Sequence, residues 1–399
     1  SNRLITKLFS SFFGVKGVIL TMAVLAIFYI IGIFINIKKK DYLFTFFIFA
    51  FFLIAFMTTY AYYFNPAIGY WILDSDFGFI VKVLDVRSSI SALLVILLVN
   101  KSEKLFRNFK IIGYILFSYC ILHILLFHLN GNWEAYFITY TTRDASSSYN
   151  MNLGYDILFS GLILASIYLK EKRLHQLIIA SIAVGLSVIY GSRGAIVIYA
   201  AYLVLAFLLF IKDLGLKEII KFNVLFLVFT VIVSFAYIKI DSFILENTYL
   251  GEKREEAMLE GEESPSRSIE MISEGEFTNS NGRLNIWNMG LEAFSDKPIF
   301  GYGVFGDRPY VGKYVKWGYS HNIFVEILAN FGLVGFTVFI AFLVMVFITI
   351  FKLAFIDRIL VIILASMSIK LILSDSFWYL PHFWGFLGLM IIFWTRNKK

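Results

Sequence analysis

Eleven apolar segments, each close in length to a membrane-crossing helix, dominate this sequence. A helix needs about 20 apolar residues to cross the roughly 30 Å hydrocarbon layer of a bilayer. We place these segments at residues 14–37, 42–63, 77–99, 111–128, 153–169, 174–190, 195–211, 222–240, 323–351, 359–374 and 377–394. Their number and length predict an all-α, polytopic integral membrane helical bundle of about 11–12 transmembrane helices.

The composition excludes a soluble globular fold. Hydrophobic residues make up 59% of the chain and charged residues 16%, where a soluble domain carries about 25% charged residues. The formal net charge is +7, but membrane proteins concentrate Lys and Arg in cytoplasmic loops, so we expect no nucleic acid partner. The single cysteine, Cys120, lies in an apolar segment and allows neither an intramolecular disulfide nor a cysteine metal cluster.

Basic residues alternate between successive connecting segments, and this alternation predicts the orientation. They follow the first, third, fifth, seventh and ninth apolar segments and close the chain, whereas the short intervening connections hold one basic residue or none. The chain therefore divides into transmembrane helices 1–8 over residues 1–240, a large outer loop over 241–320 and transmembrane helices 9–11 over 321–399. This topology leaves the amino terminus outside, which indicates either a missing first span or residues 4–13 lying on the membrane surface.

The outer loop carries the acidic excess of the chain. Residues 241–320 hold 14 Asp and Glu against 8 Lys and Arg, a net charge of −6, which leaves +13 elsewhere. The glutamate-rich part, residues 252–263, predicts a solvated, partly helical face. From 281 to 319 the loop becomes aromatic and glycine-rich, so we expect this half to fold against the membrane.

A short outer turn, residues 190–195 with the sequence Tyr-Gly-Ser-Arg-Gly-Ala, places Arg193 at a membrane boundary. One interpretation is an arginine that anchors to lipid headgroups. The two flanking glycines favour a second interpretation, because they let the backbone approach an anion closely while the guanidinium offers a planar fork matched to phosphate oxygens.

Residues 281–294 predict an amphipathic helix on the outer membrane surface, since Leu284, Trp287, Leu291 and Phe294 share one helical face. Arg283 lies at its amino-terminal end, where the helix dipole adds to the arginine charge, so a bound anion is stabilised twice. A glycine-punctuated turn follows over residues 297–306.

His321, within Ser320-His321-Asn322, opens the ninth apolar segment from the outer side. The ordinary histidine pKa of about 6.5 leaves the imidazole largely neutral at working pH, so it can act as a general base. An interfacial histidine with no role in chemistry is the alternative when this motif is taken alone.

Together these motifs resemble the superfamily of O-antigen ligases and O-antigen polymerases. The resemblance rests on Ser-Arg-Gly in a short outer loop, then Gly-Arg-x-x-x-Trp, Gly-Tyr-Gly and Ser-His-Asn leading into Phe-Gly-Leu-Val-Gly. It covers about residues 160–351, and the chain is one span short of the family pattern at its amino end. The resemblance implies a large periplasmic loop and metal-independent glycosyl transfer, with no cofactor, on the outer face of the bacterial inner (cytoplasmic) membrane.

The resemblance also implies residue roles. Arg193 and Arg283 correspond to arginines that bind the diphosphate of an undecaprenyl-diphosphate-linked glycan, and His321 to the histidine that assists the acceptor hydroxyl. Attack from the face opposite the diphosphate would invert the anomeric centre.

Other outer polar groups are weaker candidates. One alternative is that they line an acceptor or diphosphate groove, and the other is that they belong to a solvated loop. These residues are Tyr302, Arg308, Lys313, Lys316 and Tyr319. Lys370 and Asp375, near the outer end of the tenth segment, are either functional or snorkel to the interface.

We therefore predict a membrane glycosyltransferase that polymerises lipid-linked repeat units, an O-antigen or capsular polysaccharide polymerase. Its expected partners are the undecaprenyl-diphosphate-linked oligosaccharide donor, a glycolipid acceptor, membrane lipid and a chain-length regulator protein. An O-antigen ligase, which transfers the same donor glycan to lipid A-core, is the close alternative. A lipid-linked glycan flippase is a distant one, because it would need a polar path through the midplane and the polar groups here cluster outward.

Overall fold

The computed structural model describes residues 52–53, 55–63, 66, 68–73, 78–79, 83, 89–99, 101–130, 150–247, 282–313 and 318–396. Those residues contain helices and connecting turns but no strand, so the predicted all-α class is confirmed. The helices are α4 (Ile68–Leu73), α5 (Ser89–Val99), α6 (Ser102–Asn130), α7 (Met151–Glu171), α8 (Leu174–Tyr190), α9 (Arg193–Leu214), α10 (Leu216–Asn247), α13 (Arg283–Asp296), α14 (Arg308–Val311), α15 (Ile323–Ile350), α16 (Phe355–Ser368), α17 (Lys370–Leu373) and α18 (Pro381–Arg396).

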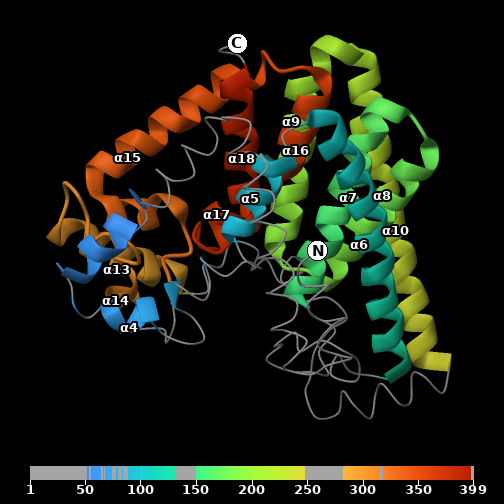
Figure 1. Cartoon of the computed structure of the whole chain (residues 1–399). Coiled ribbons are helices and arrows are strands. Elements are labelled where there is room, and N and C mark those ends of the chain that lie inside the picture. The colour runs from blue at the N-terminus through green and yellow to red at the C-terminus, as the bar shows by residue number, and fades with distance from the viewer. Residues whose placement is uncertain are drawn as a thin grey trace.

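The helices form a bundle with α15 at one side. Helices α6, α7, α8 and α10 pack together on the other side, and α16 and α18 lie between them and α15 (Figure 1). The short α13 packs on the first part of α15, and α17 contacts both α15 and α9. Segments far apart in the sequence, the start of α9 and the end of α16, therefore approach one another through α17.

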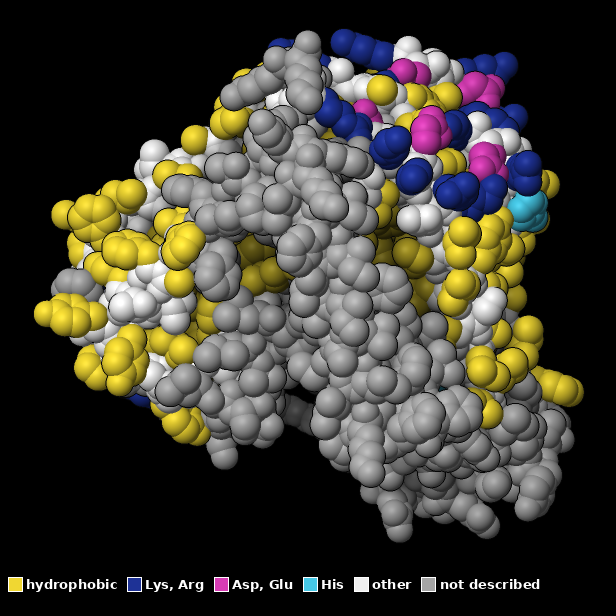
Figure 2. Space-filling view, viewed as in Figure 1, with side chains coloured by type: hydrophobic (Ala, Val, Ile, Leu, Met, Phe, Trp, Pro, Cys, Tyr) yellow, Lys and Arg dark blue, Asp and Glu magenta, His cyan; other side chains and the backbone are white. Residues whose placement is uncertain are grey.

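Basic side chains gather at one end of the described bundle, which we call the basic end. Figure 2 shows Lys and Arg side chains over the end where α6 and α16 begin and α9 gives way to α10. The connections between α8 and α9 and between α13 and α15 lie toward the opposite end (Figure 1). The alternation of basic residues along the sequence thus corresponds to two separate ends of the molecule.

Five described helices are long and apolar enough to cross a membrane, namely α6, α7, α9, α10 and α15. The first predicted segment, residues 14–37, lies outside the described residues, and the second and third are described only in part. The prediction of one continuous helix over 359–374 is wrong, because α16 ends at Ser368 and the four-residue α17 follows. The last helix begins at Pro381 rather than at residue 377, since residues 374–380 form a loop.

Helix α15 is interrupted at Gly332, whose φ of 60° and ψ of −160° lie outside the helical region. The turn at residues 297–306, which we call the outer turn, packs against this break. Gly303 N donates to Asn330 O at 2.7 Å, and Leu333 N donates to Pro298 O at 2.8 Å. A Cβ at Gly332 would lie 2.4 Å from the backbone of Ile299, so only glycine allows this approach. The break therefore fixes the outer turn, residues 297–306, to the side of α15.

Candidate active site

His321 lies directly before α15, in a left-handed conformation with a φ of 51°. Its Nδ1 is 3.2 Å from the carbonyl oxygen of Ser374. Because a carbonyl only accepts, this contact assigns the proton to Nδ1 and leaves Nε2 as the basic nitrogen. Burial of the ring, followed by the positive charges of Arg283 and Arg308, lowers the pKa of His321, which the Ser374 contact and Asp375 partly oppose. The imidazole is therefore neutral near pH 7 and can accept a proton.

Arg283 is the first residue of α13, as predicted, and Gly282 precedes it in the left-handed region. Helix α13 buries Ile286, Gly290 and Ala293, whereas Leu284 and Leu291 are exposed. A Cβ at Gly290 would lie 2.5 Å from Val325 Cγ1 and 2.8 Å from Ser320 Oγ, so α13 is pressed against the start of α15. This contact brings the Arg283 charge close enough to act on His321.

Arg193 is the first residue of α9, and Ser192 precedes it. Ser192 Oγ is 2.8 Å from the hydroxyl of Tyr155 on α7. The two glycines of this turn serve α7 rather than a ligand: a Cβ at Gly194 would lie 2.3 Å from the Tyr155 hydroxyl, and Gly191 lies against Gly154. Helix–helix contact thus accounts for glycines that the sequence associates with an anion, and it holds Arg193 at a helix amino terminus, where an anion is favoured.

Helix α17 and the loop after it connect the Arg193 turn with His321. Lys370 Nζ lies 4.1 Å above the Tyr155 ring, and it pairs with Asp375 at 2.9 Å. Ser374 directly precedes Asp375. Its carbonyl oxygen contacts His321 and accepts a hydrogen bond from the Tyr319 hydroxyl at 3.2 Å. The candidate site therefore runs from Ser192 through Tyr155, Lys370 and Asp375 to His321.

Arg308 occupies a different position from either expectation, because it is neither in a solvated loop nor exposed to a groove. Its side chain is 1% exposed. Its Nη1 donates to Asp307 Oδ2 at 2.6 Å, and its Nη2 donates to Glu326 Oε1 at 2.9 Å and to Ser376 Oγ at 3.0 Å. Asp307 Oδ2 also accepts from the backbone and the hydroxyl of Ser320, at 2.9 and 2.7 Å. This buried charge cluster joins the residue before His321 to the loop after α17.

Glu326, a member of this buried charge cluster, is not among the candidates that the sequence motifs indicate. The signal for it is a lone carboxylate one turn into an otherwise apolar segment, which by default marks a buried pair or a functional group.

The remaining candidates divide into two groups. Tyr319 belongs to the site, and burial raises the pKa of its hydroxyl well above the usual range. The Tyr302 hydroxyl contacts that of Tyr310 at 2.9 Å, so Tyr302 belongs to the junction of α13 and α14. Lys313 lies over the Tyr310 ring in the same junction. Lys316 lies outside the described residues.

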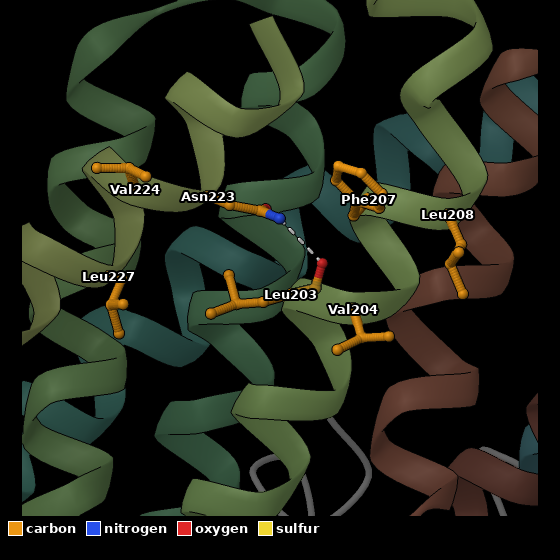
Figure 3. Close-up of a pocket in the computed structure, with 7 residues that line it drawn as sticks. All are labelled: Leu203, Val204, Phe207, Leu208, Asn223, Val224 and Leu227. Atoms are coloured by element: carbon orange, nitrogen blue, oxygen red, sulfur yellow. Dashed lines mark hydrogen bonds between the residues drawn. The ribbon is translucent and has the colours of Figure 1, made fainter. Parts of the chain in front are cut away.

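No group of three or more His, Cys, Asp or Glu in the described part of the chain is arranged to hold a metal ion. A groove between α9 and α10 is lined by apolar side chains and Asn223, whose Nδ2 donates to Leu203 O at 3.1 Å (Figure 3). It contains no cationic or titratable group. The charged groups beside α17, and not this groove, therefore define the candidate site.

The fold and these groups define a multi-pass, all-α membrane protein with cationic and titratable side chains gathered around a short helix. Residues 178–340 match a family model described as O-antigen ligase. This match supports membership of the O-antigen ligase and polymerase superfamily, which the resemblance in its motifs predicts, and members of this family are membrane glycosyltransferase-like enzymes. No curated protein and no solved structure matches the chain.

Proposed function

We propose that this protein is an O-antigen or capsular polysaccharide polymerase. It transfers glycan from undecaprenyl diphosphate to a lipid-linked repeat unit at the periplasmic face of the inner membrane. The observation that carries the proposal is the neutral His321 beside Arg283, joined through Asp375, Lys370 and Tyr155 to the turn that holds Arg193. Two cations at helix amino termini can neutralise a diphosphate leaving group, and one neutral base can accept the proton of a sugar hydroxyl.

The two arginines act on the leaving group. Diphosphate departs with a growing negative charge as the anomeric C–O bond lengthens, and a planar guanidinium neutralises phosphate oxygens well. Both Arg193 and Arg283 begin helices, so backbone N–H groups add to the same field.

His321 acts on the acceptor. With Nδ1 held by the Ser374 carbonyl, Nε2 takes the proton of the acceptor hydroxyl as its oxygen forms the new bond to the anomeric carbon. Attack opposite the departing diphosphate inverts the anomeric centre.

The ligase reaction is the second candidate, because the matched family model is described as O-antigen ligase. Both reactions use the same donor and leaving group, and they differ only in the acceptor. We favour the polymerase because the amino-terminal part of the chain matches the family only in being hydrophobic, as in the divergent polymerases.

The test is transfer by purified protein in vesicles with repeat units on undecaprenyl diphosphate, with and without lipid A-core, followed by gel analysis. A ladder from the repeat unit alone supports the polymerase. A single shift that requires lipid A-core supports the ligase, and no transfer with either acceptor contradicts both.

The site assignment has its own variants. Arg193→Ala, Arg283→Ala and His321→Ala should each reduce transfer by at least about 100-fold, the usual scale for a lost acid–base or electrostatic group. Lys297→Ala is a matched control, because Lys297 lies at the other end of α13 and contacts the Tyr302 ring. Full activity of both Arg193→Ala and His321→Ala would refute the assignment.

A further inference from the structure

The surroundings of α15 change at the Gly332 break. Before it, most side chains from Ile323 to Asn330 are buried within the protein. After it, most side chains from Leu333 onward are exposed, and Val338 reaches 65%. Residues 333–350 extend about 27 Å at 1.5 Å per residue, close to the roughly 30 Å hydrocarbon layer. The exposed apolar part of α15 therefore begins at Leu333 rather than at residue 323, and its length fits one crossing of the hydrocarbon layer with the break at one edge.

The outer turn lies at this same level. Leu333 N donates to Pro298 O at 2.8 Å, and Val334 N donates to Ile299 O at 3.1 Å. Ile299 and Phe300 nevertheless leave their side chains 58% and 64% exposed. Figure 2 shows hydrophobic side chains along the flank formed by α15 and the helices beside it. Two large apolar side chains thus project at the depth where the lipid-facing surface of α15 begins.

We propose that Ile299 and Phe300, with Leu333 and Val334, form a boundary wedge that inserts where acyl chains meet headgroups. We favour lipid as the contact of the wedge, because the wedge is continuous with the exposed apolar face of α15. The carbonyls of Pro298 and Ile299 already accept hydrogen bonds from α15, so these two groups can enter an apolar layer without losing hydrogen bonds to water.

The wedge fixes the level of α13 relative to the membrane. Helix α13 ends at Asp296, directly before the wedge, and it carries Arg283 at its other end. The proposal concerns the membrane contact alone, and it holds whichever acceptor the enzyme uses.

The test is the collision accessibility of a spin label in vesicles. The label is attached through Phe300→Cys in a Cys120→Ser background, since Cys120 is the only native cysteine. We expect Phe300→Cys to be more accessible to oxygen and less accessible to a water-soluble nickel complex than Ser295→Cys, by at least about threefold in the ratio of the two accessibilities. Ser295 is an exposed polar residue in the last turn of α13, so it is a matched control. Val338→Cys supplies the deep reference.

Two outcomes would overturn the proposal. An oxygen-to-nickel ratio at Phe300→Cys equal to that at Ser295→Cys would place the wedge in water. Low accessibility to both reagents at Phe300→Cys would show that protein, and not lipid, covers it. The exposed position of Phe300 makes misfolding of this variant a small concern, and Ile299→Cys provides a second label at the same level with the same expected ratio.

Discussion

Replacing Arg308 by methionine should destabilise the protein strongly, because it leaves two carboxylates buried without their cation. Asp307 and Glu326 are both fully buried, and Arg308 contacts them at 2.6 and 2.9 Å. Breaking a buried ion pair by removing one partner costs about 3–5 kcal/mol. The protein can instead relieve one buried carboxylate by protonating it. At pH 7 this protonation costs about 4 kcal/mol for a carboxyl whose pKa in the unfolded chain is the ordinary value near 4, so the two costs are of similar size.

The same reasoning predicts how the loss depends on pH. Protonating one such carboxyl costs only about 1 kcal/mol at pH 5, so the deficit of Arg308→Met should shrink as the pH falls. The sign follows because removing the positive charge of Arg308 favours proton binding to the neighbouring carboxylates in the folded state, and such binding stabilises the folded variant as the pH falls. Equilibrium unfolding in a mild detergent, followed by Trp fluorescence at pH 7 and pH 5, measures both values.

A matched control lies at the basic end. Arg358 Nη2 pairs with Asp213 at 2.6 Å, but the Asp213 side chain is 31% exposed and keeps water when Arg358 is lost. Arg358→Met should therefore cost no more than about 2 kcal/mol. A loss for Arg308→Met no larger than that for Arg358→Met, or a loss that does not shrink at pH 5, would refute the reasoning.

Two further predictions concern the site, and a third concerns the break in α15. The acidic limb of the pH–rate profile should have its midpoint below pH 6.5, because burial lowers the pKa of His321 and only the neutral ring accepts a proton; a midpoint at or above 6.5 contradicts this. Lys370→Met removes the ion pair of Asp375, so the uncompensated carboxylate should shift this midpoint upward, and an unmoved profile would argue against the contact path through α17. Gly332→Ala should lower the free energy of unfolding by more than about 2 kcal/mol, since it adds a backbone clash to left-handed strain. Gly215→Ala, which has positive φ but open space, should cost about 1 kcal/mol, and equal losses in the two variants would show that the clash is absent.

The sequence predicts much of the fold because membrane spans can be recognised from local composition. Five of the predicted segments correspond to helices long enough to cross a bilayer, and Arg283 stands at the start of its helix as expected. These features depend on residues close together in the chain. Hydrophobic length and helix periodicity report on such neighbours directly.

The buried charge cluster could not be predicted in the same way. Arg308 contacts Ser376, 68 residues later, and Glu326, 18 residues later, so no local pattern pairs them. The local sequence does not predict the break in α15 either, because Gly332 is one small residue in an apolar segment. Its conformation is explained by the hydrogen bonds that the outer turn makes with α15. Long-range pairing decides both features.

Whether an arginine can serve a diphosphate depends on what already balances its charge. Arg308 and Arg283 both lie close enough to His321 to lower its pKa. The guanidinium of Arg308 faces two carboxylates, so it brings little net positive charge to an incoming anion and instead holds Ser320 and the loop at Ser376 in place. Arg283 makes no ion pair with any described carboxylate, and it stands half-buried at the positive end of a helix dipole. Composition gives the two residues equal weight, but the positions of the carboxylates assign Arg308 to the framework and support the proposal that Arg283 binds the substrate.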